Sequence, residues 1–191
     1  MLLELLTTRF GLTEAIWLQY ADCFVRQQVP AHTTLLAEGE VARRVYFVEQ
    51  GCLRGWFNAQ GKDVTFQFFF EQQTVSSLES FSSQKPSLFS LETLEPCVLW
   101  WINRADAYRL LEELGEGPQA REQLAGLLLS RVQHYLTHAV AFVRDTPQQR
   151  YEHLLARAPW VVQRVPQHYI ASYLGITPVH LSRLKRRVVG H

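Results

Sequence analysis

The chain has 191 residues, of which 47% are hydrophobic and 19% are charged, a composition typical of a soluble globular protein with one or two domains. No apolar run reaches the roughly 18 to 20 residues that span a bilayer, and the N-terminus lacks a basic region followed by an apolar signal, so we expect a cytoplasmic protein without a membrane partner. Cys23, Cys52 and Cys97 are too far apart for a CxxC metal pattern or a disulfide framework, and we interpret them as small core residues.

The net charge of +1 conceals an uneven distribution of charge along the chain. Residues 1–143 contain 11 Lys and Arg against 16 Asp and Glu, whereas residues 144–191 contain 8 against 2. We expect a cationic C-terminal module of this kind to bind a polyanion, while the acidic N-terminal part must have another role.

The N-terminal two thirds of the chain change in pattern from helix to strand. Residues 5–28 have mainly helical spacing, with Thr13 as an N-cap, and short β-branched and aromatic runs over about residues 30–102 predict a small β-barrel or jelly roll. The fold class is therefore α+β. The segment "NAQGKD" predicts a hairpin turn, and the alternation after it places four side chains on one strand face: Val64, Phe66, Phe68 and Phe70. The aromatic residues of this region form either a filled core or the lining of a cavity for an apolar ligand: Phe66, Phe68, Phe70, Phe81 and Phe89.

A short helix from about Arg104 is followed by "GEGP" and by a long periodic segment, residues 118–144. This helix carries two lines of side chains, and a helix that is apolar on two sides must bury both. We expect one line to pack on the chain's own β-region and the other on a second copy, which gives a homodimer. The alternative is a helix enclosed between domains of one chain, and the polar Arg131 and His138 count against the dimer. We assign the dimer seam to the line with heptad spacing: Leu124, Leu128, Arg131, Tyr135, His138 and Phe142. The second line is Leu129, Val132, Leu136, Val140 and Val143.

The C-terminal segment has the spacing of a helix-turn-helix. A helix begins at Pro147 and ends before Pro159, and a helix pair follows from Gln167. Gly175 supplies the positive φ of the turn, and Thr177 caps a second helix that begins at Pro178. The small Ala171 lies where the two helices cross, and four apolar residues lock them together: Ile170, Leu174, Leu181 and Leu184.

The second helix of this pair, from Pro178 to about Val188, is expected to lie in the major groove of DNA. Arg183 is our candidate for a bidentate contact to guanine. Lys185, Arg186 and Arg187 are expected to neutralise phosphates, which gives affinity without sequence preference. The alternative is a solvated basic tail on a helical hairpin, which leaves the spacing unexplained. The complete candidate contact set is Thr177, Val179, His180, Ser182, Arg183, Lys185, Arg186 and Arg187.

The chain as a whole resembles the Crp/Fnr family of bacterial transcription regulators. The most specific motifs are "RVPQHYIASYLGITPVHLSRLKRR" and "KPSLFSLETLE", and the segment from "QQRYEHLLARAP" onward is similar to the short C-terminal form found in many Bacteroidetes-type genomes. The resemblance implies a cyclic-nucleotide-binding-like β-roll with flanking helices, a dimerisation helix and a winged-type DNA-binding domain, although the hairpin wing of longer relatives is missing or replaced. We therefore divide the chain into residues 1–116, 117–145 and 146–191.

The resemblance also implies an effector pocket that departs from the family pattern. Nucleotide-binding members use a Glu on the ribose and an Arg-Ser or Arg-Thr pair on the cyclic phosphate. Here Ser77 stands at the Glu position, and Lys85 and Pro86 replace the Arg and its neighbour. Lysine is only a point charge and proline lacks a backbone donor, so we expect that cyclic AMP is not the effector and that no cofactor is bound. The degenerate pocket comprises Ser77, Leu78, Glu79, Lys85, Pro86 and Ser87.

Other constellations in the sequence are weaker. His134 and His138 have the spacing of a two-His metal site without a third ligand, and clustered cysteines for an iron–sulfur centre are absent from the sequence. No Gly-rich phosphate loop and no GxSxG are present, so we expect no enzymatic activity. The expected function is that of a homodimeric regulator on a two-fold-symmetric double-stranded DNA site, with RNA polymerase as a further partner. The alternatives are a small-molecule or redox-sensing module with residual DNA binding, and a β-roll used only as a scaffold.

Overall fold

The computed structural model describes residues 2–115 and 118–189. Two short helices open the chain, α1 (Leu2–Phe10) and α2 (Glu14–Tyr20). Thr13 caps α2 as predicted, because its Oγ1 accepts the Ile16 N–H at 3.4 Å. The predicted helix to residue 28 is wrong at its end. A single 3-10 turn follows α2, and Val25–Val29 form strand β1, which pairs with the last strand of the sheet.

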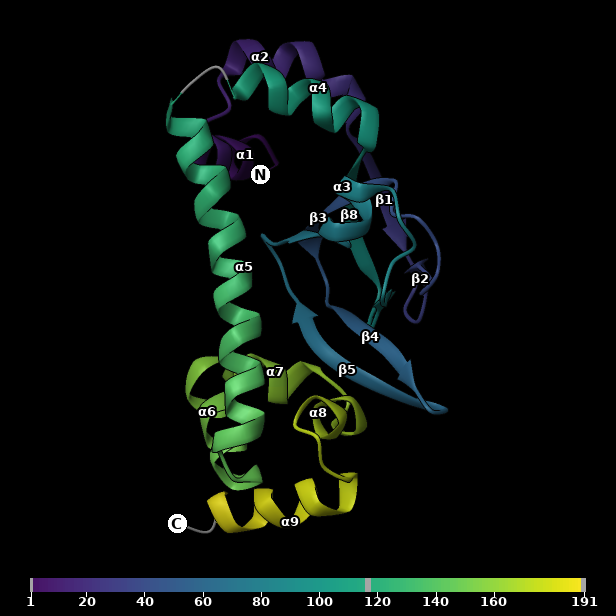
Figure 1. Ribbon diagram of the computed structural model, residues 1–191, viewed down its shortest axis with the longest axis vertical. Coiled ribbons are helices and arrows are strands. Elements are labelled where there is room, and N and C mark those ends of the chain that lie inside the picture. Colours follow the sequence, from purple (N-terminus) through teal and green to yellow (C-terminus); the bar gives the residue numbers. More distant parts are fainter. Residues whose placement is uncertain (1, 116–117, 190–191) are drawn as a thin grey trace.

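Two four-stranded antiparallel sheets form the β-roll (Figure 1). One has the strand order β1-β8-β3-β6 and the other the order β2-β7-β4-β5. This arrangement confirms the predicted jelly roll with flanking helices. The remaining strands are β2 (Thr34–Leu36), β3 (Arg44–Gln50), β4 (Leu53–Ala59), β5 (Lys62–Phe69), β6 (Thr74–Val75), β7 (Ser90–Thr93) and β8 (Cys97–Asn103).

The predicted hairpin is formed by β4 and β5, but its strand alternation is broken. Gly55 pairs with Gln67, and the next residue of β4 pairs with Thr65, so Phe66 is an extra residue in the ladder. Phe66 therefore packs against Phe89, with ring centroids 4.9 Å apart, while Phe68 packs against the C-terminal helices. The predicted common face for these phenylalanines is wrong, because a strand bulge reverses the side on which a residue points.

Helices cover the roll on one side and continue beyond it (Figure 1). Helix α3 (Leu78–Ser83) lies between β6 and β7, and α4 (Arg104–Leu114) begins at Asn103, whose side chain accepts the Asp106 N–H at 3.0 Å. The predicted long helix is α5, Pro118–Arg144, which runs along the molecule from the end of α4 to the C-terminal helices. In residues 2–115 and 118–189 no helix has the length and hydropathy that crossing a membrane requires.

The C-terminal part consists of four helices in the residues that the structure describes. Thr146 begins the first with a capping box to Gln149. The helices are α6 (Pro147–Arg157), α7 (Pro159–Arg164), α8 (Gln167–Tyr173) and α9 (Pro178–Val189). No strand occurs between residues 147 and 189, so the winged arrangement that the resemblance implied is absent from this range.

Two hydrophobic cores hold the chain together. The first fills the roll and the space beneath α1 and α4, with Leu53 and Leu99 fully buried. The second joins the outer face of β4 and β5 to the C-terminal helices, with Phe68 and Phe70 packed among residues such as Ile170. The C-terminal helices therefore share their core with the roll rather than forming a separate unit.

Candidate nucleic-acid interface

Helices α8 and α9 are joined by the tight turn that the sequence predicted. Gly175 has φ +66°, and Thr177 Oγ1 accepts the His180 N–H at 3.2 Å at the start of α9. All five predicted packing residues are at most 3% exposed: Ile170, Ala171, Leu174, Leu181 and Leu184. The turn and the packing fix the angle between the two helices.

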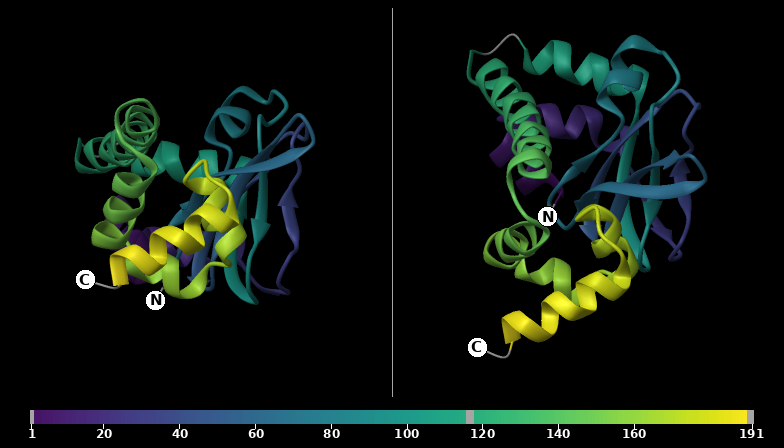
Figure 2. Two further views of the ribbon diagram at one scale, coloured as in Figure 1. Left: turned by 90° about the horizontal axis from the view of Figure 1, so that it is seen from below. Right: turned by 60° about the horizontal axis from the view of Figure 1, so that its bottom comes forward.

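The outer face of α9 carries the predicted contact residues. Figure 2 shows α9, in yellow, at one end of the molecule and on its surface. Ser182 and Lys185 are half-buried, and the other six predicted contact residues are exposed: Thr177, Val179, His180, Arg183, Arg186 and Arg187. None of the four cations of α9 forms an ion pair with a residue of the described chain. A helix face with free cations and no acidic residue can bind a polyanion.

Helix α8 is fixed to the β4–β5 hairpin by polar contacts. Ser172 Oγ accepts the Thr65 N–H and donates to the Asp63 carbonyl, both at 2.9 Å. The guanidinium of Arg54 lies 4.1 Å from the centroid of the Tyr169 ring. Sequence reasoning missed this contact, since nothing in the local pattern around Arg54 or Ser172 indicates a partner more than 100 residues away.

A second polar contact joins α7 to the roll. The Glu71 carboxylate accepts two hydrogen bonds from Arg164, at 2.7 and 2.8 Å, and one from the Gly51 N–H at 2.9 Å. Arg164 also bonds Glu95. The Arg164 guanidinium is the main cause that lowers the pKa of Glu71 to about 2.

This pairing predicts an acid-dependent loss of stability. Because the pKa of Glu71 is below its ordinary value in the folded state, the pair stabilises the protein above about pH 4.5, and that contribution is lost as the pH falls toward 2. In Glu71→Gln the free energy of unfolding should fall less between pH 5 and 3 than in the wild type, as measured by urea unfolding at each pH. Glu79→Gln, on the exposed face of α3, is the matched control. Equal pH dependence in wild type and Glu71→Gln would contradict the assignment.

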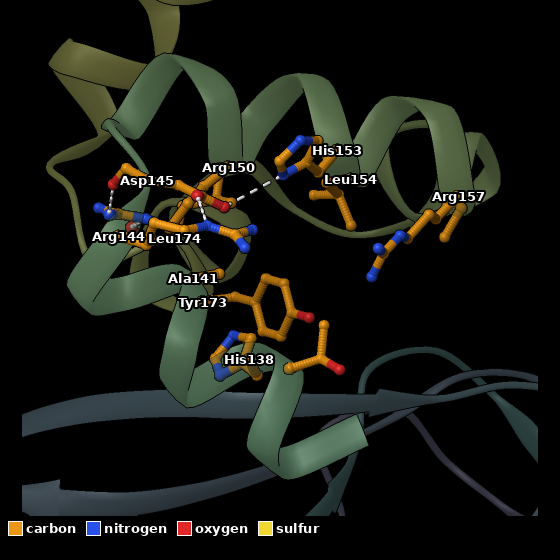
Figure 3. Close-up of a pocket in the computed structure, with 12 residues that line it drawn as sticks. His138, Ala141, Arg144, Asp145, Arg150, His153, Leu154, Arg157, Tyr173 and Leu174 are labelled. Carbon is orange, nitrogen blue, oxygen red and sulfur yellow. Dashed lines mark hydrogen bonds and ion pairs between the residues drawn. The ribbon is translucent and has the colours of Figure 1, made fainter. Parts of the chain in front are cut away.

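The end of α5 meets the C-terminal helices at a small cavity of about 150 Å³ (Figure 3). Arg150 donates to the Leu174 carbonyl at 3.1 Å and to the Asp145 carbonyl at 2.7 Å. The Asp145 carboxylate pairs with Arg144 at 2.7 Å and lies 3.3 Å from His153. Hydrogen bonding to Arg144 lowers the pKa of Asp145. These hydrogen bonds and ion pairs hold the end of α5, the helix α6 and the turn before α9 together.

The predicted dimer seam of α5 faces the chain itself. Arg131 donates to the Thr74 carbonyl, Tyr135 lies near Phe66 with ring centroids 6.2 Å apart, and the His138 ring lies 4.5 Å from that of Tyr173. Leu128 borders a cavity under α4, and Phe142 lies against Gly175. The side chain of Leu124 lies outside the described residues. The heptad line therefore makes intramolecular contacts, yet Leu128, Tyr135 and Phe142 are still 41 to 45% exposed, and the dimer seam stays a prediction.

The second line of α5 is the exposed one. Its five residues are 49 to 91% exposed: Leu129, Val132, Leu136, Val140 and Val143. These side chains are therefore available to a second copy, and heptad spacing alone does not distinguish an intramolecular seam from an intermolecular one.

The six predicted effector residues lie in two segments, residues 77–79 and 85–87, and their burial differs. Ser77 and Ser87 are buried, whereas Leu78, Glu79, Lys85 and Pro86 are exposed. The Lys85 carbonyl accepts from Ser80 Oγ at 2.5 Å, and Ser87 Oγ donates to the Phe89 carbonyl at 2.7 Å. A cavity of about 200 Å³ beside β2 and β3 is lined by residues such as Arg44 and Ser76, but by none of the six.

The histidines and cysteines form no metal site in the described residues, where no group of three His, Cys, Asp or Glu gathers. His134 and His138 stack with ring centroids 6.4 Å apart, and burial lowers the pKa of each. Burial raises the pKa of Cys52 and raises that of Cys97 to about 11, so these thiols stay protonated.

Comparisons with known proteins agree with this architecture. Residues 26–114 match the family model described as "Cyclic nucleotide-binding domain". No curated protein matches the sequence at a significant level. The chain is similar to the c-di-GMP responsive global regulator CLP of Xanthomonas campestris, with TM-score 0.73, 17% identity, and coverage of 93% of this chain and 92% of that one. It is also similar to FixK2 of Bradyrhizobium japonicum, with TM-score 0.72, 18% identity, and coverage of 87% and 86%.

A third similar structure is the regulatory domain of Toxoplasma gondii PKA with cAMP, with TM-score 0.51 and 18% identity. The match covers 56% of this chain, which spans only 42% of that domain. At these identities the likeness is one of fold. Residues 26–114 thus match the sequence pattern of a cyclic nucleotide-binding domain, and the chain has the fold of the solved CLP and FixK2 structures.

Proposed function

We propose that this protein is a homodimeric, sequence-specific DNA-binding transcription regulator of the Crp/Fnr type, without enzymatic activity. The observation that carries the proposal is the exposed, capped helix α9, whose four cations have no ion-pair partner in the described chain. Such a helix can enter a major groove with its N-terminal residues at base edges. RNA polymerase is a further proposed partner. The similarity to CLP, a global regulator of Xanthomonas campestris, supports the same function.

Two positions on α9 separate base reading from phosphate binding. Arg183→Ala should weaken binding to the preferred site by about 1 to 3 kcal/mol and relax the base preference at one position of each half-site. Lys185→Ala should weaken binding to all duplexes alike and reduce the salt dependence. Binding of a duplex library by both variants, read by sequencing, checks the distinction. A uniform loss in both would show that the orientation of α9 on DNA is wrong.

The dimer is proposed to form through the second line of α5. Leu136 is 61% exposed in the monomer, so Leu136→Glu should leave folding intact while raising the dissociation constant of the dimer by roughly a hundredfold or more. The reason is that the carboxylate would be buried without a partner at the interface. Sedimentation over a range of concentrations measures this effect. Leu88→Glu, at a position that is 74% exposed outside α5, is the control and should leave the dimer unchanged. A wild-type monomer at all concentrations would refute the proposal.

Cyclic AMP is not the proposed effector, although residues 26–114 match the cyclic nucleotide-binding domain. The Lys85 side chain is exposed, and Pro86 has no N–H to offer a phosphate. A cyclic phosphate bound at this segment would therefore lack the bidentate guanidinium that compensates a buried phosphodiester.

Selection of bound duplexes from a random pool, with and without cyclic AMP, tests the proposed function. Recovery of an inverted repeat in both conditions is expected. A repeat only with cyclic AMP would overturn the effector argument. No enrichment in either condition would favour the alternative, a sensing or scaffold β-roll with residual DNA binding.

A further inference from the structure

A cavity of about 340 Å³ lies on the outer face of the β1-β8-β3-β6 sheet, enclosed by α1, α3, α4 and α5. It is separate from the degenerate effector pocket, since only Leu78 belongs to both. Its walls are almost entirely aliphatic and aromatic, with Phe10, Phe47 and Leu110 on three different elements. Its volume is within the range of roughly 300 to 1,000 Å³ that small-molecule sites occupy.

The edge of this cavity exposes apolar side chains to solvent. Leu78, at the start of α3, is 41% exposed, and Leu128, on α5, is 45% exposed. Both line the cavity. A ligand that covered these two leucines would remove their apolar surface from water, which is favourable.

A partly buried cation lies next to the cavity. Arg131 follows Leu128 by one helical turn, and its guanidinium donates to the carbonyl of Thr74, which is itself part of the cavity wall. The guanidinium also lies 5.2 Å from the centroid of the Phe69 ring. No carboxylate of the described residues forms an ion pair with it. Burial is the main cause that lowers the pKa of Arg131; Tyr135 acts to raise it and the second cation Arg9 acts to lower it.

We propose that this cavity binds a fatty acid, with the acyl chain between α1, α4 and the sheet and the carboxylate on Arg131. The apolar walls match the chain, and a carboxylate supplies the anion that the guanidinium lacks in the described chain. Because Arg131 belongs to α5, which continues to the C-terminal helices, an occupant would contact the same helix that carries the proposed dimer face. The binding proposal itself does not depend on DNA binding.

The test uses the full chain and displacement of a fluorescent dansyl-labelled undecanoic acid by oleate or by oleyl alcohol. The wild type should bind oleate about tenfold more tightly than oleyl alcohol, since a hydrogen bond to a charged group contributes about 1.5 to 3 kcal/mol. Arg131→Gln keeps a donor for the Thr74 carbonyl but removes the charge. This substitution should lower the affinity for oleate to the affinity for oleyl alcohol. The affinity for oleyl alcohol itself should not change.

Two controls make the outcome decisive. Arg26→Gln removes an exposed cation elsewhere and should change neither affinity. Ala107→Trp places an indole in the cavity and should abolish binding of both compounds. If Ala107→Trp does not fold, the comparison of oleate with oleyl alcohol in Arg131→Gln still decides. Equal affinity of wild type and Arg131→Gln for oleate, or no displacement by oleate in the wild type, would overturn the proposal.

Discussion

Replacing Gly175 with alanine should lower the free energy of unfolding by about 2 to 5 kcal/mol and greatly weaken DNA binding. Gly175 has φ +66°, a conformation that costs an L-residue about 1 to 2 kcal/mol. A Cβ atom there would also lie 2.4 Å from Cε1 of Phe142, so the Phe142 ring or the α8–α9 turn must shift, at a further cost of about 1 to 3 kcal/mol. Urea unfolding measures the first effect, and titration of a labelled duplex measures the second.

The two causes can be separated by matched variants. Gly61 has φ +83° with nothing within 4 Å of its Cβ position, so Gly61→Ala reports the backbone strain alone and should cost about 1 to 2 kcal/mol. In Gly175→Ala combined with Phe142→Ala the clash is removed, and the loss should be smaller than the sum of the two single losses. If Gly175→Ala and Gly61→Ala lowered the free energy of unfolding equally, the contact with Phe142 would not constrain the turn.

The features that the sequence predicted well depend on neighbours in the chain. The turn before α9 needs a positive φ at Gly175 and a cap at Thr177, and both residues are local signals. The hairpin turn after Asn58 is local too, since its side chain accepts the Gly61 N–H at 2.9 Å. Patterns of this kind are interpretable because the residues that make each contact lie within one turn of the chain.

The features that the sequence misplaced depend on contacts between distant elements. The helical spacing of residues 25–28 was overridden by pairing with β8, some 70 residues later. The bulge at Phe66 depends on the register of β4 against β5, which periodicity does not reveal. In α5, Arg131 and His138 find intramolecular partners in Thr74 and Tyr173, which the helical spacing does not reveal.

The sequence pattern did not predict the contacts between the β-roll and the C-terminal helices. Arg54 lies at the centre of these contacts. This side chain is only 3% exposed, and its guanidinium bonds Glu92 at 2.7 to 2.8 Å and Thr65 and Asp63 at 3.3 Å. The guanidinium also lies over the ring of Tyr169 on α8. Arginine alone among the cations can bond in several directions while stacking on an aromatic ring.

Arg54→Met should therefore lower the free energy of unfolding by about 2 to 4 kcal/mol, because the Glu92 carboxylate, 13% exposed, would lose its guanidinium partner and keep only His32 at 3.7 Å. Urea unfolding measures the loss, and hydrogen exchange at the Thr65 amide, which donates to Ser172, should become faster as α8 separates from the hairpin. Arg26→Met is the matched control, since its pair with Glu49 is 46% exposed on the arginine side and should contribute at most about 1 kcal/mol.

Combining Arg54→Met with Glu92→Gln distinguishes a buried charge from lost packing. The second change removes the unpaired carboxylate, so the double variant should recover part of the stability that Arg54→Met loses. It should not recover the protection of the Thr65 amide, because Tyr169 still lacks the cation beneath its ring. If the double variant is as unstable as Arg54→Met and equally unprotected at Thr65, then the arginine acts through its packing on Tyr169 and the hairpin rather than through its charge on Glu92.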